Sequence, residues 1–283
     1  MKQARAAFSL LNPDEVQSRG LHPVTFGLVA STEYGYGELE DFLLPSDTPA
    51  LQRAVSMSQV HRAGERNVPS KVDIVLYEPG IACNADAYTL NRNHPELTIE
   101  RILEEHEELA LPLARQFPVF RKAVVEDIIK SVARENALFA IATALPDVVP
   151  SLVEIPWAFG EFASDTAFLT GNQVRMAFQI SVACGREAGI SRQKAEILSI
   201  AAGAFGWRAL ARELAGKIPM GGGLIPKGAI AYAGTYAVGK GLEYVYHLNS
   251  PYPKDLGRAT YKAALDKGKQ VASSIYEGMK SKA

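Results

Sequence analysis

A glycine-rich turn between an apolar run and an expected helix is the feature of this sequence that could do chemistry. Residues 24–30 read VTFGLVA, an apolar run of the length of a buried strand. Residues 38–44 favour a helix, which Pro45 would end. A P-loop has the same order of strand, turn and helix and follows the pattern G-x-x-x-x-G-K-S/T. Its backbone amides cradle phosphate, its lysine neutralises the charge and its hydroxyl holds Mg²⁺.

The turn keeps one glycine of that pattern and lacks its charged and hydroxyl groups. At the same spacing, residues 30–37 read ASTEYGYG, so that Gly35 is the second glycine. Ala30, Tyr36 and Gly37 stand where the first glycine, the lysine and the hydroxyl residue are required. Glu33 adds a negative charge beside the expected phosphates. The pattern predicts a degenerate nucleotide-binding turn at Ala30, Gly35, Tyr36 and Gly37; the alternative is an ordinary strand–turn–helix unit.

No other pattern typical of an enzyme stands out. The next apolar run, residues 72–77, ends with Tyr77 at the position where a metal-binding D-x-P-G turn has aspartate. Neither an N-K-x-D nor a T-K-x-D motif, which would recognise a guanine base, follows later in the sequence. The five histidines are scattered, neither cysteine has a neighbouring activating residue, and there is no G-x-S-x-G. We therefore expect no hydrolysis of GTP or ATP, no catalytic residue, no metal and no cofactor.

A row of polar residues marks the helix expected over residues 157–187. Glu161, Asp165, Asn172 and Arg175 follow at spacings that place them along one face of a helix. One interpretation is a face exposed to solvent. The other is a polar seam buried between helices, which could belong to an enzyme site of unrecognised type.

Small residues mark the helix expected over residues 226–247. They recur every fourth position at Ala229, Ala233, Ala237 and Gly241. Such a stripe lets another helix approach closely. Gly203 and Gly206, in a helix expected over residues 192–216, could supply the facing surface. This pattern predicts a glycine/alanine-rich helical hairpin.

Composition and patterning together predict a mainly α protein. The chain has 283 residues, 47% hydrophobic, with a net charge of −1, so no global field attracts nucleic acid. Its two cysteines suit a reducing cytoplasm better than a disulfide framework. We expect a small P-loop-like α/β piece over residues 1–95, with a strand at 72–77 and loop at 81–95. A multi-helix bundle follows over residues 96–283, and we expect Thr98 to be the N-cap of its first helix. No internal repeat is expected.

The helical part resembles a known family. The carrying stretches are QVRM (173–176), GWRALAREL (206–214), KIP (217–219) with Gly221, and AYAGTYAVG (231–239). Over residues 135–248 they are similar to the YcjF-type domain, a helical domain of poorly defined function. This domain commonly follows a small GTPase domain, and many members are thought to be membrane-associated. The resemblance implies a truncated GTPase-like N-terminal part that no longer turns over nucleotide, and it carries over no catalytic residue.

These observations predict a non-catalytic scaffold or regulatory adaptor. We expect it in the cytoplasm, as a peripheral protein or a hairpin inserted at the inner membrane. The acidic segment 96–108 could contact basic protein partners, and the basic tail 251–283, with seven Lys/Arg against three acids, could contact anionic lipid. Ordinary solvated helices are the alternative for both segments. The alternatives for function are a nucleotide-binding switch with weak GTP or ATP affinity and an enzyme with an unrecognised site.

Overall fold

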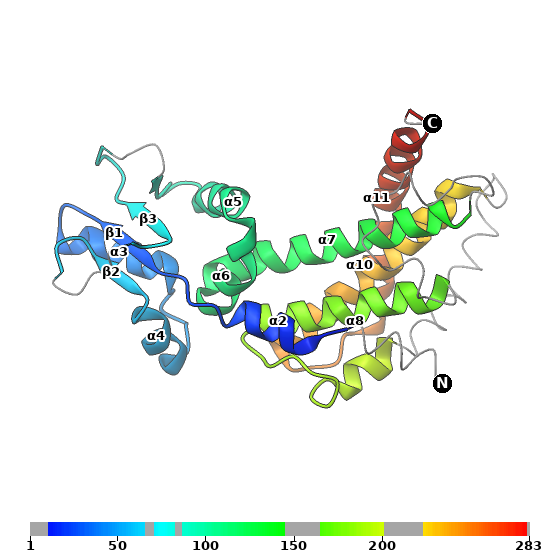
Figure 1. Cartoon of the computed structure of the whole chain (residues 1–283), viewed down its shortest axis with the longest axis horizontal. Coiled ribbons are helices and arrows are strands. Elements are labelled where there is room, and N and C mark those ends of the chain that lie inside the picture. The colour runs from blue at the N-terminus through cyan, green and yellow to red at the C-terminus, as the bar shows by residue number, and fades with distance from the viewer. Residues whose placement is uncertain (1–10, 66–70, 83–86, 145–164, 201–222, 282–283) are drawn as a thin grey trace. The chain divides into compact units, whose positions relative to one another are not determined.

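The computed structural model describes residues 11–65, 71–82, 87–144, 165–200 and 223–281 (Figure 1). The chain divides into two compact units. We call Glu15–Glu126 with Val182–Arg186 the sheet unit, and Met1–Asp14, Asp127–Ser181 and Glu187–Ala283 the helical unit. The boundary expected at residue 95 falls inside the sheet unit. The predicted fold class is confirmed, since a small parallel sheet accompanies a mainly helical chain.

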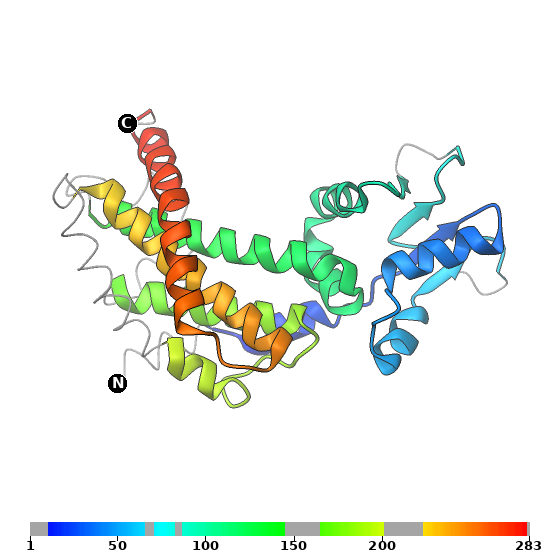
Figure 2. The ribbon, with the colours of Figure 1, turned by 180° about the vertical axis from the view of Figure 1, so that it is seen from behind.

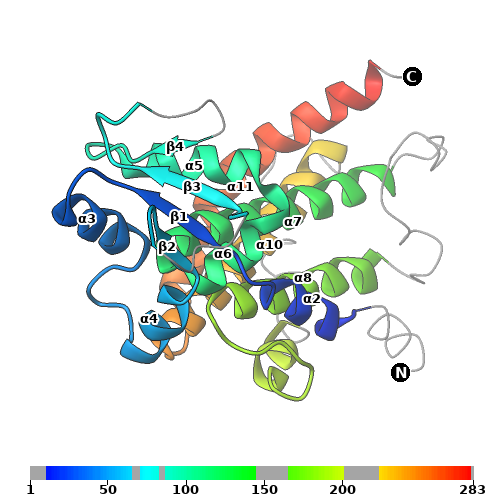
Figure 3. The ribbon, with the colours of Figure 1, turned by 60° about the vertical axis from the view of Figure 1, so that its left-hand side comes forward.

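Four short parallel strands form the sheet. They are β1 (Phe26–Val29), β2 (Val60–Arg62), β3 (Ile74–Tyr77) and β4 (Tyr88–Thr89). Their order is β2-β1-β3-β4, with Phe26 of β1 paired to Val60 on one side and Ile74 on the other (Figure 3). The apolar runs at 24–30 and 72–77 predicted the two central strands. β2 and β4 were not expected, and β4 lies in the stretch that was expected to be loop.

The sheet unit also contains five α-helices and a single 3₁₀ turn in its described part. They are α2 (Pro13–Gly20), α3 (Glu33–Leu43), α4 (Ala50–Met57), α5 (Pro95–Glu105), η1 (Glu107–Leu109) and α6 (Ala110–Gln116). α3 begins earlier than predicted because Thr32 is its N-cap and accepts a hydrogen bond from the Gly35 amide at 3.0 Å. The expectation that Thr98 is an N-cap is wrong: Pro95 begins α5, and the Thr98 hydroxyl donates to the Thr89 carbonyl instead.

Aromatic and aliphatic side chains form the core of the sheet unit. In β1 the buried residues alternate, so that Phe26 and Leu28 point into the core. The Phe26 ring meets Phe117 edge-on at 4.8 Å and stacks on Phe120 at 6.2 Å. Both phenylalanines lie around the junction between α6 and the next helix, and this contact fixes that junction to the centre of the sheet.

Four long helices account for most of the described part of the helical unit. They are α7 (Pro118–Ala142), whose residues up to Glu126 belong to the sheet unit, α8 (Asp165–Ala183), α10 (Leu224–Leu248) and α11 (Lys254–Lys280). Asn249 ends α10 in the left-handed conformation, and Pro253 precedes α11. These residues turn the chain so that α11 runs back across α10 (Figure 2).

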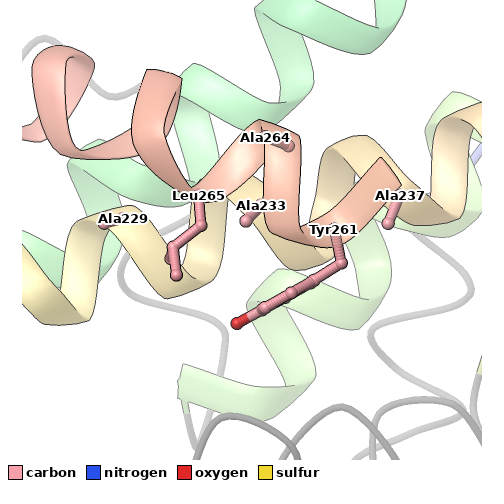
Figure 4. Close-up of a cluster of buried hydrophobic side chains, with 6 residues drawn as sticks. All are labelled: Ala229, Ala233, Ala237, Tyr261, Ala264 and Leu265. Atoms are coloured by element: carbon pink, nitrogen blue, oxygen red, sulfur yellow. The ribbon is translucent and has the colours of Figure 1, made fainter. Parts of the chain in front are cut away.

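The small-residue stripe of α10 packs against α11. Ala229, Ala233 and Ala237 are buried with Tyr261 and Leu265 in one cluster, as Figure 4 shows. Gly241, the last residue of the stripe, faces the Tyr252 ring. The predicted partner residues Gly203 and Gly206 lie outside the described residues. In the part of the chain that the structure describes, the helix that covers the stripe is therefore the C-terminal one.

α11 contains a short repeat that was not expected from the sequence. An acid followed three residues later by a base recurs every eleven residues, at Asp255/Arg258, Asp266/Lys269 and Glu277/Lys280. The first two pairs form ion pairs, at 3.6 Å and 2.8 Å. Eleven residues complete about three turns of helix, so the repeat places its acids and its bases in two straight rows.

Among the helices of the described residues, none is both long enough and apolar enough to cross a membrane. α10 has the required length, but its mean hydropathy is reduced by tyrosines, threonine and charged residues such as Lys227 and Lys240.

Candidate functional site

The C-terminal ends of β1 and β3 form the natural place for a ligand in this sheet. β2 lies on one side of this strand pair and β4 on the other, so the chain reverses its direction of travel across the sheet here. Open parallel sheets bind ligands at such a reversal, beyond the carboxyl ends of the strands. We call this region, with Ser31 after β1 and Glu78 after β3, the carboxyl edge.

The predicted nucleotide-binding residues lie at or near the carboxyl edge, but they do not form one loop. Only Ala30, Ser31 and Thr32 connect β1 to α3. Gly35, Tyr36 and Gly37 are already inside the helix. A P-loop wraps phosphate with a longer run of backbone amides before its helix begins. The three-residue connection therefore provides a helix N-terminus without the surrounding cradle.

The side chain of Glu78 occupies this helix N-terminus. Its Oε2 accepts hydrogen bonds from the Ser31 amide and from the Ser31 hydroxyl, both at 2.8 Å. A Cβ placed on Gly35 would lie 2.6 Å from the Glu78 carboxyl carbon, so the missing side chain of Gly35 makes room for the carboxylate. The Ser31 amide, then the Ser31 hydroxyl, and finally the charge of Arg92 hold the pKa of Glu78 below its ordinary value. An anion of the protein itself thus lies where a P-loop would bind phosphate.

Arg92 completes the charge arrangement at the carboxyl edge. Its guanidinium makes two hydrogen bonds of 2.6 Å to the two carboxylate oxygens of Glu38. It also lies 3.7 Å from Glu78. The hydrogen bond from Arg92 lowers the pKa of Glu38. Two-pronged pairing of this kind is among the stronger ion pairs in proteins, and it leaves Arg92 engaged with carboxylates.

A second arginine fixes the outer side of α3. Arg62 of β2 binds the carboxylates of Glu33 and Glu40, each at 2.7 Å. Its guanidinium also lies over the ring of Tyr36, 5.1 Å from the centroid. Tyr36, which stands in the lysine position of the P-loop pattern, therefore packs against an arginine that the protein's own carboxylates hold. Gly37 has no side chain within 4 Å of its Cβ position.

The key residue of this site could have been found from the sequence. Ser31 follows the first apolar run, two residues after β1 ends, and Glu78 follows the second, directly after β3 ends. The carboxyl ends of neighbouring parallel strands meet at one edge, so the two residues had to be close if the strands were neighbours. The sequence did not give the order of the strands in the sheet, and the comparison with the P-loop pattern did not define that order.

The polar row of α8 lies partly in a buried seam of the helical unit. Asn136 of α7 is 0% exposed and donates to the Thr235 hydroxyl of α10 at 2.8 Å. The Asn172 side chain donates to the side-chain oxygen Oδ1 of Asn136 at 2.9 Å. Gln173 donates to the same Thr235 hydroxyl at 3.2 Å. This seam joins α7, α8 and α10 through hydrogen bonds among its own residues.

The other predicted members of that row are placed differently. Arg175 forms an ion pair with Glu135 of α7, where both side chains are partly exposed. Asp165 is the first residue of α8, and Glu161 lies outside the described residues. Of the predicted row, Asn172 thus joins the buried seam, whereas Arg175 pairs with Glu135 at a partly exposed position. The geometry of the seam is that of a hydrogen-bonded helix contact.

Replacement of Glu78 by glutamine tests the charge at the carboxyl edge. Because the folded-state pKa of Glu78 is lowered, its ionised form stabilises the fold above the unfolded-state pKa of about 4.3. This contribution is lost as the pH falls through the lower, folded-state pKa. We expect E78Q to melt below the wild type at pH 7 and the difference to shrink in acid. Glu100→Gln, at an exposed position of α5, is the control; an equal loss in both variants would contradict the role of Glu78.

No group of three or more His, Cys, Asp or Glu side chains that could hold a metal ion occurs among the described residues. Comparison of the chain with family models, with characterised proteins and with solved structures finds no match. The resemblance of residues 135–248 to the YcjF-type domain remains a prediction from the quoted stretches.

Proposed function

We propose that this protein is a non-catalytic scaffold or regulatory adaptor whose sheet unit is a GTPase-like domain that has lost its nucleotide. The observation that supports this most is the carboxylate of Glu78 at the N-terminus of α3. A nucleotide phosphate that approached this place would be repelled, because the fixed negative charge of Glu78 already occupies the position that the phosphate charge would take. Tyr36 also stands where a lysine would offset that charge.

The test of this proposal is a calorimetric titration of the full chain with GTP, GDP and ATP, each with and without Mg²⁺. We expect no saturable heat up to millimolar nucleotide. E78Q is the informative companion, since it removes the competing charge without supplying a lysine or a metal-binding hydroxyl; it should also fail to bind. Saturable, Mg²⁺-dependent binding by the wild type would favour the nucleotide-binding switch over the adaptor.

For α11 we propose contact between the scaffold and an anionic membrane surface. The supporting observation is a row of exposed cations, Lys254, Arg258, Lys262, Lys269 and Lys280. On an ideal helix they fall within an arc of about 80°. The buried face of α11, which includes Tyr261 and Leu265, packs against α10 directly beside this row, so the basic row flanks the helix contact. The ion pairs of Arg258 with Asp255 and of Lys269 with Asp266 weaken the positive electrostatic field of the row.

Vesicle binding tests the membrane proposal. Deletion of residues 251–283 would remove Tyr261 and Leu265 from the core, so charge substitutions are the better probe. Each cation near an anionic surface contributes about 1 kcal/mol, so R258Q/K262Q should bind phosphatidylserine vesicles about 30-fold more weakly in low salt. The control K194Q/K267Q removes the same charge from exposed positions outside the row. Equal binding by the two double variants would contradict the proposal.

A further inference from the structure

The turn between α10 and α11 exposes two leucines. Leu248 is the last residue of α10 and is 58% exposed, and Leu256 lies in the first turn of α11 and is 44% exposed. In the described part of the helical unit, the large apolar side chains that are exposed are Ile190, Leu198, Leu248 and Leu256. Gln193, which lies between the first two, donates to the Tyr246 hydroxyl of α10. All four therefore come from two segments that meet at the C-terminal end of α10. We call residues 248–256 the tip.

The tip is held in place because its aromatic residue packs against both helices. The Tyr252 hydroxyl shares a hydrogen bond of 2.7 Å with the Thr260 hydroxyl of α11, and its ring centroid lies 5.3 Å from that of Tyr244 of α10. The Cβ positions of Gly241 and Gly257 would lie 3.1 and 3.4 Å from the same ring, so these glycines make room for it. The tyrosine thus points inward and the leucines remain outside. A turn fixed in this way loses little conformational entropy when it binds.

Cations next to the exposed leucines indicate what the tip can bind. Lys254, Arg258 and Lys262 are exposed on the first turns of α11, about 6 Å apart along the helix axis. Against these three cations, residues 248–262 contain a single acid, Asp255. Apolar side chains beside several cations are typical of a surface that binds a bilayer, where an apolar phase lies beneath anionic headgroups. A bilayer takes up single apolar side chains, so the contact requires neither a matching groove nor a large protein interface.

The positions of the leucines determine how α11 can approach a membrane. Leu256 follows Lys254 by two residues, or about 200° around the helix, so a helix lying flat on its basic row would turn Leu256 away from the bilayer. An approach with the tip first brings Leu248, Leu256, Lys254 and Arg258 to the surface together. Lys269 then lies about 22 Å from Lys254 along the axis, well beyond the screening length of about 8 Å at physiological salt.

We propose that residues 248–256 are a membrane-insertion tip: Leu248 and Leu256 enter the headgroup–acyl boundary of an anionic bilayer, and the first three cations of the basic row bind its headgroups. The inference rests on the proposed membrane contact of α11 and gives that contact an orientation. L248S/L256S should bind phosphatidylserine vesicles about 30-fold more weakly than the wild type. Because insertion is apolar, this loss should change little as the salt concentration rises, whereas the loss in R258Q/K262Q should shrink. Both leucines are exposed, so the variant should fold and melt like the wild type.

The experiment measures binding of the full chain to phosphatidylserine vesicles. The control L21S/L97S removes two leucines of similar exposure from the sheet unit. A second control, K269Q/K280Q, removes two exposed cations that are remote from the tip. We expect both controls to bind like the wild type. The environment-sensitive fluorescent amino acid Anap at position 248 should shift its emission to the blue on vesicles, and Anap at position 97 should not.

Three results would overturn this inference while the wild type still binds the vesicles. They are an equal loss in the leucine control, the absence of a blue shift at position 248, and a loss in K269Q/K280Q as large as that in R258Q/K262Q, which would mean that α11 lies flat. In each case the membrane contact of α11 stands without the tip. A wild type that does not bind the vesicles would overturn both the contact and the tip. None of these results alters the nucleotide titration.

Discussion

Replacement of Gly268 by leucine is expected to lower the free energy of unfolding of the helical unit by about 3 kcal/mol, as overpacking of a close contact does. A Cβ at this position would lie 2.8 Å from the Ala229 carbonyl oxygen and 3.2 Å from the Ala229 Cα. Both atoms belong to the backbone of α10, which can move away only by separating the two helices. The whole buried cluster of Ala233, Tyr261 and Leu265 would then loosen.

Gly278 provides a matched control on the same helix. Nothing lies within 4 Å of its Cβ position. Leucine is a better helix former than glycine, so G278L should raise the free energy of unfolding by about 0.5 kcal/mol or more. The two variants are compared by urea denaturation followed by circular dichroism. Loss of stability in both, or in neither, would contradict the close packing of α10 on α11.

Replacement of Asn136 by leucine is expected to have the second largest effect, a loss of about 2 kcal/mol. The side chain is fully buried and joins Thr235 to Asn172 by two hydrogen bonds, of 2.8 and 2.9 Å. Leucine has a similar volume but leaves both partners without that hydrogen bond. The cost comes from desolvated polar groups rather than from a cavity. Urea denaturation of the wild type and of N136L measures this loss in the free energy of unfolding.

A double-mutant cycle separates the polar seam from simple packing. Thr235→Val alone removes the hydroxyl to which Asn136 and Gln173 donate. In N136L/T235V the apolar side chains face each other, and the combined loss should be smaller than the sum of the single losses by about 1 kcal/mol. Strict additivity would show that the two residues do not act together.

The long helices and the two central strands could be predicted from local patterns. The helices expected over residues 157–187 and 226–247 are observed as α8 and α10, the latter to within a few residues at each end. The continuous apolar runs before Ser31 and Glu78 predicted β1 and β3. These segments bury enough side chains for their own sequence to determine their conformation.

Elements whose conformation depends on their neighbours were not predictable. β2 has three residues and β4 has two, and both exist because they pair with a central strand. The stripe at Ala229 and Ala233 indicated close helix packing but could not specify which helix would cover it. α11 appeared to be a polar tail, because its buried face consists mainly of glycine and alanine, which add little hydrophobicity.

The candidate site was located by its sequence pattern, whereas its chemistry depends on a residue outside that pattern. Residues 30–37 led to the carboxyl edge. The carboxylate that fills the edge comes from Glu78, more than forty residues away. The compensating arginine comes from Arg92, after β4. Contacts between distant segments become readable only when the strand order is known.

The most direct test of the central claim is an NMR titration of the Glu78 side-chain carboxyl carbon, recorded with and without Mg²⁺ and GTP. If Ser31 and Arg92 hold this carboxylate at the N-terminus of α3, its pKa lies below about 4.3, and added nucleotide leaves the curve unchanged. A pKa at or above that value, or a shift caused by GTP, would contradict a sheet unit whose anion position is filled by its own glutamate.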